Sequence, residues 1–331
     1  MAGILAAGAS VPRYRLPREL IAKEWGGTSA GGEKAVANHD EDSLTLAVNA
    51  TLALGSEGPR PDAVFFATTT APYAEKQAAA TIATVLDLPA SVRTLDFTDT
   101  LRAGTSAVLA GLDAVAGGSA ARVVVAAGLA EVIATHTVAD EFLGTWRTRE
   151  QEFPRAFPGA FEAKFGYGRV IGEVVKGVLA KARLEPRQLA TVILPTPTPR
   201  APQAVAKAAG LDAKRQLQES FWTTLGDTGA AQPLLMLAAA LERAKADDLI
   251  LVVGYGDGAD AIVLRATGRP VPPGQGVARQ IEVKRTLPSY GRYARFRKLV
   301  RKETVATESS SPVILWRDRK PSARTRTGSR R

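Results

Sequence analysis

The stretch Gly104-Thr105-Ser106-Ala107 opens an apolar segment over residues 108–115, which leads to Arg122-Val123-Val124-Val125-Ala126-Ala127-Gly128. The apolar segment predicts a helix, and the run of valines predicts a buried strand. The preceding residues, Asp99-Thr100-Leu101-Arg102-Ala103, follow another apolar run and predict a strand-to-helix turn. A thiol on such a turn would lie at a helix N-terminus, where the helix dipole lowers its pKa. This turn offers no thiol, because the chain of 331 residues contains no cysteine.

The same pattern returns in the second half of the chain. Gly229-Ala230-Ala231 leads through an apolar segment over residues 234–241 to Leu249-Ile250-Leu251-Val252-Val253-Gly254. The glycines that open the two copies are 125 residues apart, and those that close them are 126 apart. Two copies of a helix followed by a buried strand predict a duplicated α/β architecture. The alternative is that two unrelated units look alike because Ala, Val and Gly are abundant in this chain.

Three further stretches, in order along the chain, support a resemblance to a known family. They are Thr68-Thr69-Thr70-Ala71-Pro72-Tyr73-Ala74-Glu75-Lys76, Gly226-Asp227-Thr228-Gly229-Ala230-Ala231 and Tyr255-Gly256-Asp257-Gly258-Ala259-Asp260. With the duplication, they resemble the thiolase superfamily, and within it the 3-hydroxy-3-methylglutaryl-CoA synthase and ketoacyl synthase III branch. The resemblance covers about residues 1–268. It implies an α/β fold of α/β/α/β/α layers, with one half over residues 1–160, a second over 161–268, and a basic extension over 269–331.

The resemblance also implies where the reactive residues of the family would fall. The nucleophilic cysteine corresponds to Leu101, the acid–base glutamate to Thr69, the oxyanion-binding histidine to Pro195, and the asparagine of a Gly-Asn-Thr-Gly motif to Asp227. Leucine cannot attack a thioester, and proline has no donor for an oxyanion. An ionised aspartate would repel the oxyanion that asparagine stabilises. Four departures together predict that cysteine-dependent condensation is absent and the active site degenerate.

Two kinds of function are compatible with such a site. The first is a non-condensing partner or scaffold subunit. The second is a lyase, by retro-aldol or decarboxylation chemistry, or an acyltransferase without a covalent cysteine intermediate. In the lyase, a desolvated Asp227 would act as the base. No second catalytic group is identifiable at a fixed spacing from Asp227, so the scaffold is the preferred hypothesis.

An aromatic and basic segment lies between the two halves. It contains Trp146 and Arg147, which are candidates for binding coenzyme A because arginine grips phosphate and stacks on aromatic planes. The alternative is a surface excursion that covers the core or a partner. The resemblance implies an acyl-CoA or acyl-carrier thioester as ligand, with no other cofactor, and a homodimer.

Composition restricts the remaining possibilities. The absence of cysteine excludes disulfides and thiolate metal sites. With only two histidines, His39 and His136, a metal centre is improbable. Both histidines are interpreted as loop residues. The chain has no membrane-spanning run and no signal peptide, so a cytoplasmic protein is expected.

The net charge of +10 belongs to the C-terminal region. Residues 279–331 hold 16 Lys or Arg and 4 Asp or Glu. Within them, residues 280–284 predict a short strand, and residues 289–300 predict an amphipathic helix with Tyr290, Tyr293 and Phe296 on one side. Disorder is expected from Thr304 onward. A docking arm is favoured over a nucleic-acid-binding segment, because no nucleic-acid motif accompanies the charge.

The same region resembles the connector of longer relatives. In those proteins, sequences like Ser289–Tyr293 and Trp316–Lys320 precede a zinc-ribbon and OB-fold domain. The sequence given stops at Arg331, before any ribbon cysteine. The chain is therefore interpreted as a natural short form of such a protein, as a truncated reading, or as a subunit whose OB-fold partner is a separate chain.

Overall fold

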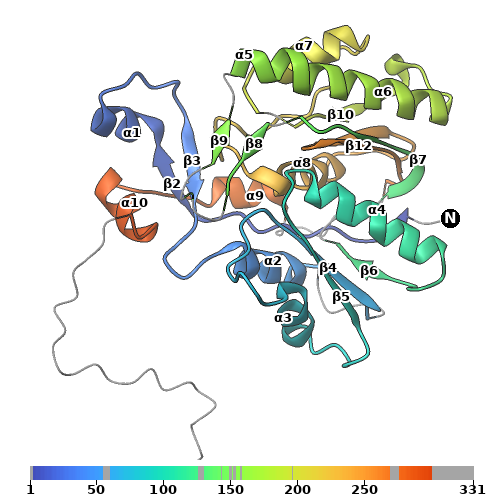
Figure 1. The fold of residues 1–331 in the computed structure, drawn as a ribbon, viewed down its shortest axis with the longest axis horizontal. Coiled ribbons are helices and arrows are strands. Elements are labelled where there is room, and N and C mark those ends of the chain that lie inside the picture. Colours follow the sequence, from blue (N-terminus) through green and yellow to red (C-terminus); the bar gives the residue numbers. More distant parts are fainter. Residues whose placement is uncertain are drawn as a thin grey trace, which may run out of the picture.

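The computed structural model confirms the predicted α/β class and describes residues 3–54, 60–125, 130–142, 144–148, 151, 154–156, 159–195, 197–268 and 276–299 (Figure 1). Its largest sheet has five strands in the order β1-β7-β12-β11-β10. The strands are β1 (Gly3–Ile4), β7 (Ala130–Ala139), β12 (Gly258–Ala266), β11 (Leu249–Tyr255) and β10 (Thr191–Ile193). β10 runs parallel to β11, and the other pairs are antiparallel. The strand predicted at residues 249–254 is therefore confirmed.

A second sheet of three parallel strands has the order β5-β4-β6. It consists of β4 (Ala63–Ala67), β5 (Arg93–Phe97) and β6 (Val123–Val124). Val64 and Phe66 pack against α2 (Ser43–Leu52) and α3 (Ala78–Val85), whereas Ala63 and Phe65 pack against α4 (Ala103–Ala116). Successive strand residues point to opposite faces, so this sheet is covered on both sides. Of the strand predicted over residues 122–128, the last three residues lie outside the described part.

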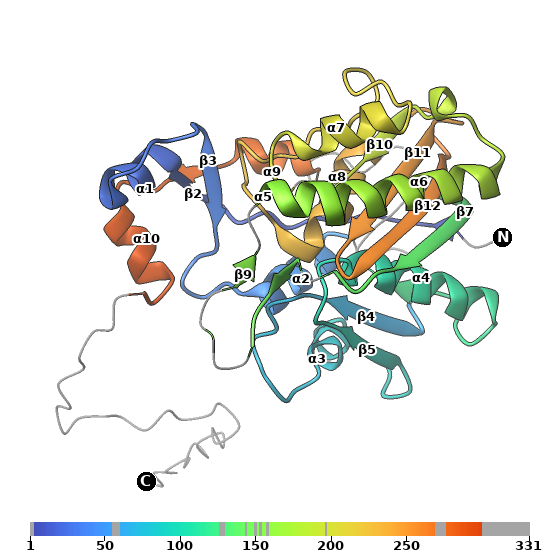
Figure 2. The same cartoon turned by 45° about the horizontal axis from the view of Figure 1, so that its top comes forward.

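The two sheets share a middle layer of helices. This layer contains α4 and α8 (Gln232–Leu241), and α8 packs on Ile250, Val252 and Ile262 of the large sheet. The opposite face of that sheet carries α6 (Gly168–Ala182) and α7 (Ala201–Ala208), which pack on Leu251 and Val253. The order from α2 and α3 to α6 and α7 is therefore α/β/α/β/α (Figure 2).

Strand β7 corrects one prediction. His136 was expected in a loop, but it lies in β7 opposite Ala261 of β12. Its ring faces α6, where a Cβ on Gly177 would overlap it. The misplacement arose because β7 alternates polar and apolar residues and has mostly half-buried side chains, a pattern that resembles an exposed segment.

Short elements lie between β7 and α6 and in the loops that follow α6. β8 (Thr145–Trp146) and β9 (Arg155–Ala156) pair as a small antiparallel ribbon. The short helix α5 (Gly159–Phe161) runs into a π-helical turn, η1 (Glu162–Tyr167). Two 3₁₀ turns follow later, η2 (Pro186–Gln188) and η3 (Gly229–Ala231). None of the helices in the described ranges is both long and apolar enough to cross a membrane.

The described end of the chain, residues 276–299, forms a C-terminal arm. It contains α9 (Val277–Glu282), β13 (Arg285–Thr286) and α10 (Tyr290–Phe296). β13 adds to a hairpin of β2 (Tyr14–Pro17) and β3 (Glu33–Val36), giving a sheet of order β13-β2-β3, with α1 (Arg18–Trp25) beside it. The arm therefore packs against residues 9–36, near the start of the described chain but far from the labelled N-terminus (Figure 2).

The strand predicted at residues 280–284 is wrong, because those residues belong mainly to α9. The Glu242 carboxylate accepts hydrogen bonds from Val277 N and Ala278 N and so caps the start of that helix. The side-chain amide of Gln280 pairs with the backbone near the start of the chain. Its Oε1 accepts a hydrogen bond from Val11 N at 2.7 Å, and its Nε2 donates one to Ala9 O at 2.9 Å. These long-range contacts override the local strand preference.

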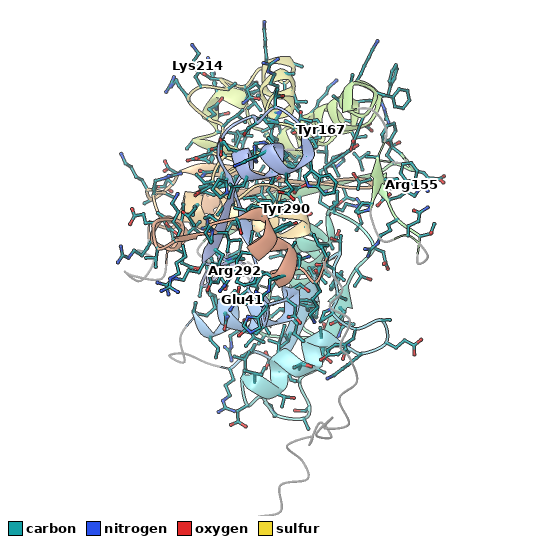
Figure 3. All side chains as sticks on the ribbon, turned by 90° about the vertical axis from the view of Figure 1, so that its left-hand side faces the viewer. Glu41, Arg155, Tyr167, Lys214, Tyr290 and Arg292 are labelled. Carbon is teal, nitrogen blue, oxygen red and sulfur yellow. The ribbon has the colours of Figure 1, made fainter. Side chains whose placement is uncertain are left out.

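The helix predicted in the basic aromatic segment is confirmed as α10, which Figure 3 shows with Tyr290 and Arg292 labelled. Tyr290, Tyr293 and Phe296 pack around Leu16 and its neighbours. The Phe296 ring meets Tyr14 edge-on, with centroids 5.1 Å apart. The aromatic face thus docks within the same chain.

Candidate active site

A cavity of about 270 Å³ opens among segments that are far apart in the sequence. It lies between the start of α4, the residues after β10, the loop before α8, and the η1 turn with the β8–β9 ribbon. Its lining residues are Leu101, Thr145, Ala156, Gly159, Glu162, Ala163, Pro195, Pro197, Thr198, Ala201, Asp227, Gly229, Gln232, Pro233 and Tyr255.

Three of the four positions predicted from the resemblance line this one cavity: Leu101, Pro195 and Asp227. The fourth, Thr69, is adjacent. A Cβ built on Gly229 would lie 3.9 Å from Thr69 Oγ1 and 4.0 Å from Leu101 Cδ2. Residues separated by more than 150 positions in the sequence therefore converge at one place.

Leu101 lies on the turn that precedes α4, as predicted. Thr100 Oγ1 donates to Gly256 O at 3.0 Å, which ties this turn to the end of β11. Gly256 has φ +155°, and a Cβ there would come within 2.9 Å of Leu101 N. The glycine therefore permits the close approach of two backbones that places Leu101 in the cavity.

A buried carboxylate fixes the first turn of α4. Asp260, in β12, accepts hydrogen bonds from Thr105 Oγ1 at 3.1 Å, Ser106 Oγ at 2.8 Å and Thr137 Oγ1 at 3.0 Å. Arg102 Nη1 lies 3.4 Å from the same carboxylate. Because both carboxylate oxygens are satisfied by several donors, the start of α4 is held against the large sheet.

Asp227 is exposed at the mouth of the cavity, and its Oδ1 accepts a hydrogen bond from Gly229 N at 2.8 Å. The prediction of Asp227 as base required a desolvated side chain, which this position does not provide. Pro195 is buried after β10, and its carbonyl accepts from the Tyr167 hydroxyl at 2.6 Å. That carbonyl is thus engaged within the protein.

Glu162 was not singled out by the sequence, yet it lines the same cavity. It is half-buried at the first position of the π-helical turn, and this burial raises the pKa of its carboxyl group. Tyr255 lines the cavity too, and the pKa of its phenol is raised by burial first and by the nearby charge of Glu162 second. No motif marks Glu162, because a π-helical turn has no sequence pattern by which it could be predicted.

The predicted coenzyme A residues lie beside the cavity. Thr145 of β8 lines it, whereas Trp146 is half-buried and Arg147 exposed, and neither of the two lines it. Within the described ranges, no cluster of three or more His, Asp or Glu is arranged to hold a metal ion.

Comparison with known proteins supports the resemblance predicted from the sequence. Residues 179–265 match the model of the 3-oxoacyl-[acyl-carrier-protein] synthase III C-terminal family. The chain is 28% identical to the hydroxymethylglutaryl-CoA synthase of Methanopyrus kandleri, with 89% of this chain and 97% of the relative covered. It is 29% identical to that of Archaeoglobus fulgidus, with 81% and 90% covered.

The chain resembles the thiolase superfamily in sequence and fold. Two solved structures agree with a thiolase-superfamily fold. One is 3-oxoacyl-[acyl-carrier-protein] synthase III from Aquifex aeolicus, with TM-score 0.68, 20% identity, and 80% of this chain and 99% of that chain covered. The other is MvaS in complex with 3-hydroxy-3-methylglutaryl coenzyme A, with TM-score 0.66, 19% identity, and 92% and 94% covered. These comparisons support the resemblance to the branch that contains hydroxymethylglutaryl-CoA synthases and ketoacyl synthases III.

Proposed function

We propose that this chain binds an acyl-CoA or acyl-carrier thioester in the cavity and forms no acyl-enzyme through a cysteine. The convergence of Leu101, Pro195 and Asp227 on one cavity supports this proposal. The names of the related proteins supply the ligand class, since one solved structure of this fold is complexed with CoA and another is in complex with an acetyl donor carrier protein.

The chemistry of the lining residues argues against a covalent route. The described lining contains no Cys, Ser, His or Lys. A leucine at the place of the thiol and a proline at the place of the histidine remove both the nucleophile and an oxyanion donor. Asp227 adds a carboxylate at the mouth of the cavity. Binding without acyl transfer to the protein is therefore the simplest function that these residues support.

Within this proposal, a specific observation favours a non-covalent lyase over a purely structural subunit. A scaffold needs no titratable group inside its cavity, whereas this cavity holds the half-buried Glu162 next to the phenol of Tyr255. A carboxylate whose pKa is raised by burial is a stronger base than a solvated one, which suits it to proton transfer. If this protein binds thioesters without turning them over, a partner or scaffold subunit is the predicted function.

Calorimetry with a panel of thioesters tests the proposed binding. We expect acetyl-CoA and 3-hydroxyacyl-CoA to bind, and intact-protein mass spectrometry to show no acyl adduct. Thr198→Trp should abolish the binding, because Thr198 is exposed at the cavity and a bulky ring there would block it. Thr84→Trp, on the exposed side of α3, is the matched control and should bind normally.

Equal binding by the two variants, or no binding by the unmodified protein, would overturn the proposal. A stable acyl adduct would overturn its second half. The homodimer and the separate OB-fold partner stay predictions. Light scattering of the purified chain tests the first, and co-purification with an OB-fold protein tests the second.

A further inference from the structure

We propose that Glu162 and Tyr255 are the reacting pair of the cavity, and that they cleave a 3-hydroxyacyl thioester by a retro-aldol reaction. Glu162 exchanges the proton, and Tyr255 donates a hydrogen bond to the thioester oxygen. This proposal rests on the thioester binding proposed above. It assigns the base to Glu162 and not to Asp227.

Two glycines make room for the pair. A Cβ on Gly144 would lie 3.3 Å from Glu162 Oε1, so the residue that precedes β8 passes close beside the carboxylate. A Cβ on Gly166 would lie 2.6 Å from the Tyr255 hydroxyl oxygen. The backbone therefore closes tightly around both functional groups. Such closeness fixes their position before a ligand arrives.

Aromatic rings form a wall beside the same turn. The Phe142 ring stacks on Phe161 with centroids 5.9 Å apart, and Phe161 lies 4.9 Å from Phe165. Phe161 immediately precedes Glu162 in the chain. Burial of the Glu162 side chain at this turn raises the pKa of its carboxyl group.

The charges near the pair favour a neutral phenol and a carboxyl group that can exchange its proton. Of the described lining residues, Asp227 is the only other ionisable group. Near Tyr255, the carboxylates Asp140 and Asp257 reinforce the effect of Glu162 on the phenol, while Arg169 opposes it. Arg169 Nη2 is itself bound to Asp140 Oδ2 at 2.5 Å. The phenol stays protonated and can donate to a developing oxyanion.

The proposed step balances with the substrate alone. The Glu162 carboxylate accepts the proton of the 3-hydroxyl group, and the bond between C2 and C3 breaks. The C3–O bond becomes a carbonyl, and the electron pair of the broken bond forms the enolate of the shorter thioester. Tyr255 donates to the enolate oxygen. Glu162 then returns the proton to C2, so the products are an aldehyde or ketone and an acyl thioester.

The test uses the full chain with 3-hydroxybutyryl-CoA and 3-hydroxy-3-methylglutaryl-CoA as probes. Acetyl-CoA formation is followed by mass spectrometry, and exchange of the acetyl-CoA methyl protons in D₂O reports the proton transfer separately. Glu162→Gln should lower both rates about 10²–10⁴-fold, the range for loss of a general acid–base group. Tyr255→Phe should lower cleavage about 10²–10³-fold, as for loss of one oxyanion donor. Both variants should bind acetyl-CoA within about threefold of the unmodified protein.

Glu24→Gln, at an exposed residue of α1 outside the cavity lining, is the matched control and should keep the cleavage and exchange of the unmodified protein. Asp227→Asn tests the alternative base, and its effect should be smaller than that of Glu162→Gln. Full activity in Glu162→Gln, or a loss confined to Asp227→Asn, would overturn the assignment. Binding without cleavage or exchange by the unmodified protein would overturn the reacting pair while leaving the proposed thioester binding intact. Absence of binding would overturn the proposed function itself. Circular dichroism and melting curves show whether a variant has failed to fold.

Discussion

The ammonium group of Lys34, in the N-terminal hairpin, lies 5.4 Å from the centre of the Tyr293 ring in the C-terminal arm. The same residue borders the loop that carries Asp227, since a Cβ on Gly226 would lie 3.2 Å from Lys34 Cβ. The hairpin also donates Glu33 N to Thr223 O and Ala35 N to Leu225 O, both at 2.8 Å. The arm therefore supports the hairpin, and the hairpin supports the loop at the mouth of the cavity.

Replacing Leu287 tests the support from the arm. Leu287 is 2% exposed and packs with Leu16 and Val36, so Leu287→Ala should lower the free energy of unfolding by about 2–5 kcal/mol. Leu299→Ala, at a side chain that is 45% exposed, should change it by less than about 0.5 kcal/mol. Urea denaturation compares the two, and equal midpoints would show that the arm adds no stability.

Asp260 offers a second test, at the anchor of α4. Asp260→Asn leaves the guanidinium of Arg102 without its charged partner, which should cost about 3–5 kcal/mol. Asp113→Asn, on the exposed side of the same helix, serves as control. Guanidinium denaturation measures both, and a small effect at Asp260 would mean that the hydroxyl donors alone hold the helix.

Two glycines of α6 should respond in opposite directions to the same substitution. Gly172 has open space around its missing Cβ, so Gly172→Ala should stabilise the protein by up to about 1 kcal/mol through helix propensity. Gly177→Ala would press on the ring of His136 and should destabilise by about 1–3 kcal/mol. Thermal unfolding checks the signs, and His136→Ala should rescue the second variant.

Restoring a thiol tests the assignment of Leu101. Leu101→Cys places a thiol at the turn before α4, where the dipole of the helix should lower its pKa. We expect it to react with iodoacetamide faster than Val85→Cys, a surface control that is 48% exposed. It should acquire an acyl group from acetyl-CoA only slowly, because Pro195 supplies no oxyanion donor. Rapid acylation would show that other donors fill that role.

The raised pKa of Glu162 predicts a pH profile. The reacting form is the carboxylate, so kcat/KM for cleavage should fall as the pH drops through the pKa of Glu162, above its ordinary value of 4.5. The other ionisable groups lining the cavity are Asp227 and Tyr255. The residual activity of Glu162→Gln should not show this fall at low pH.

The same group should act on stability with the opposite sign. Because the folded state holds the proton of Glu162 more tightly than the unfolded chain, folding is favoured at low pH. This contribution is lost as the pH rises through the folded-state pKa. The free energies of unfolding of the unmodified protein and of Glu162→Gln, measured over a pH series, should therefore become equal at acidic pH. A difference that does not change with pH would contradict the raised pKa.

The fold followed from the sequence where local pattern and packing agree. The copies at Gly104 and Gly229 predicted the α/β class because an apolar helix and a buried strand each have a clear period. The resemblance also brought Leu101, Pro195 and Asp227 to one cavity. Glu162 was not predicted, because its burial in the cavity is created by residues far away in the sequence. The helix at residues 277–282 escaped because its cap, Glu242, lies far away in the sequence.

The hydrogen bond between Val11 and Gln280 joins residues that are 269 positions apart. β13 follows β2 far along the chain, so the sheet β13-β2-β3 can close only after the residues up to Thr286 have been synthesised. Contacts of such high sequence separation form slowly, because a long loop must close before they gain any energy. We therefore expect the sheet β13-β2-β3 to close late in folding, and the loop that carries Asp227 to gain its full support only then.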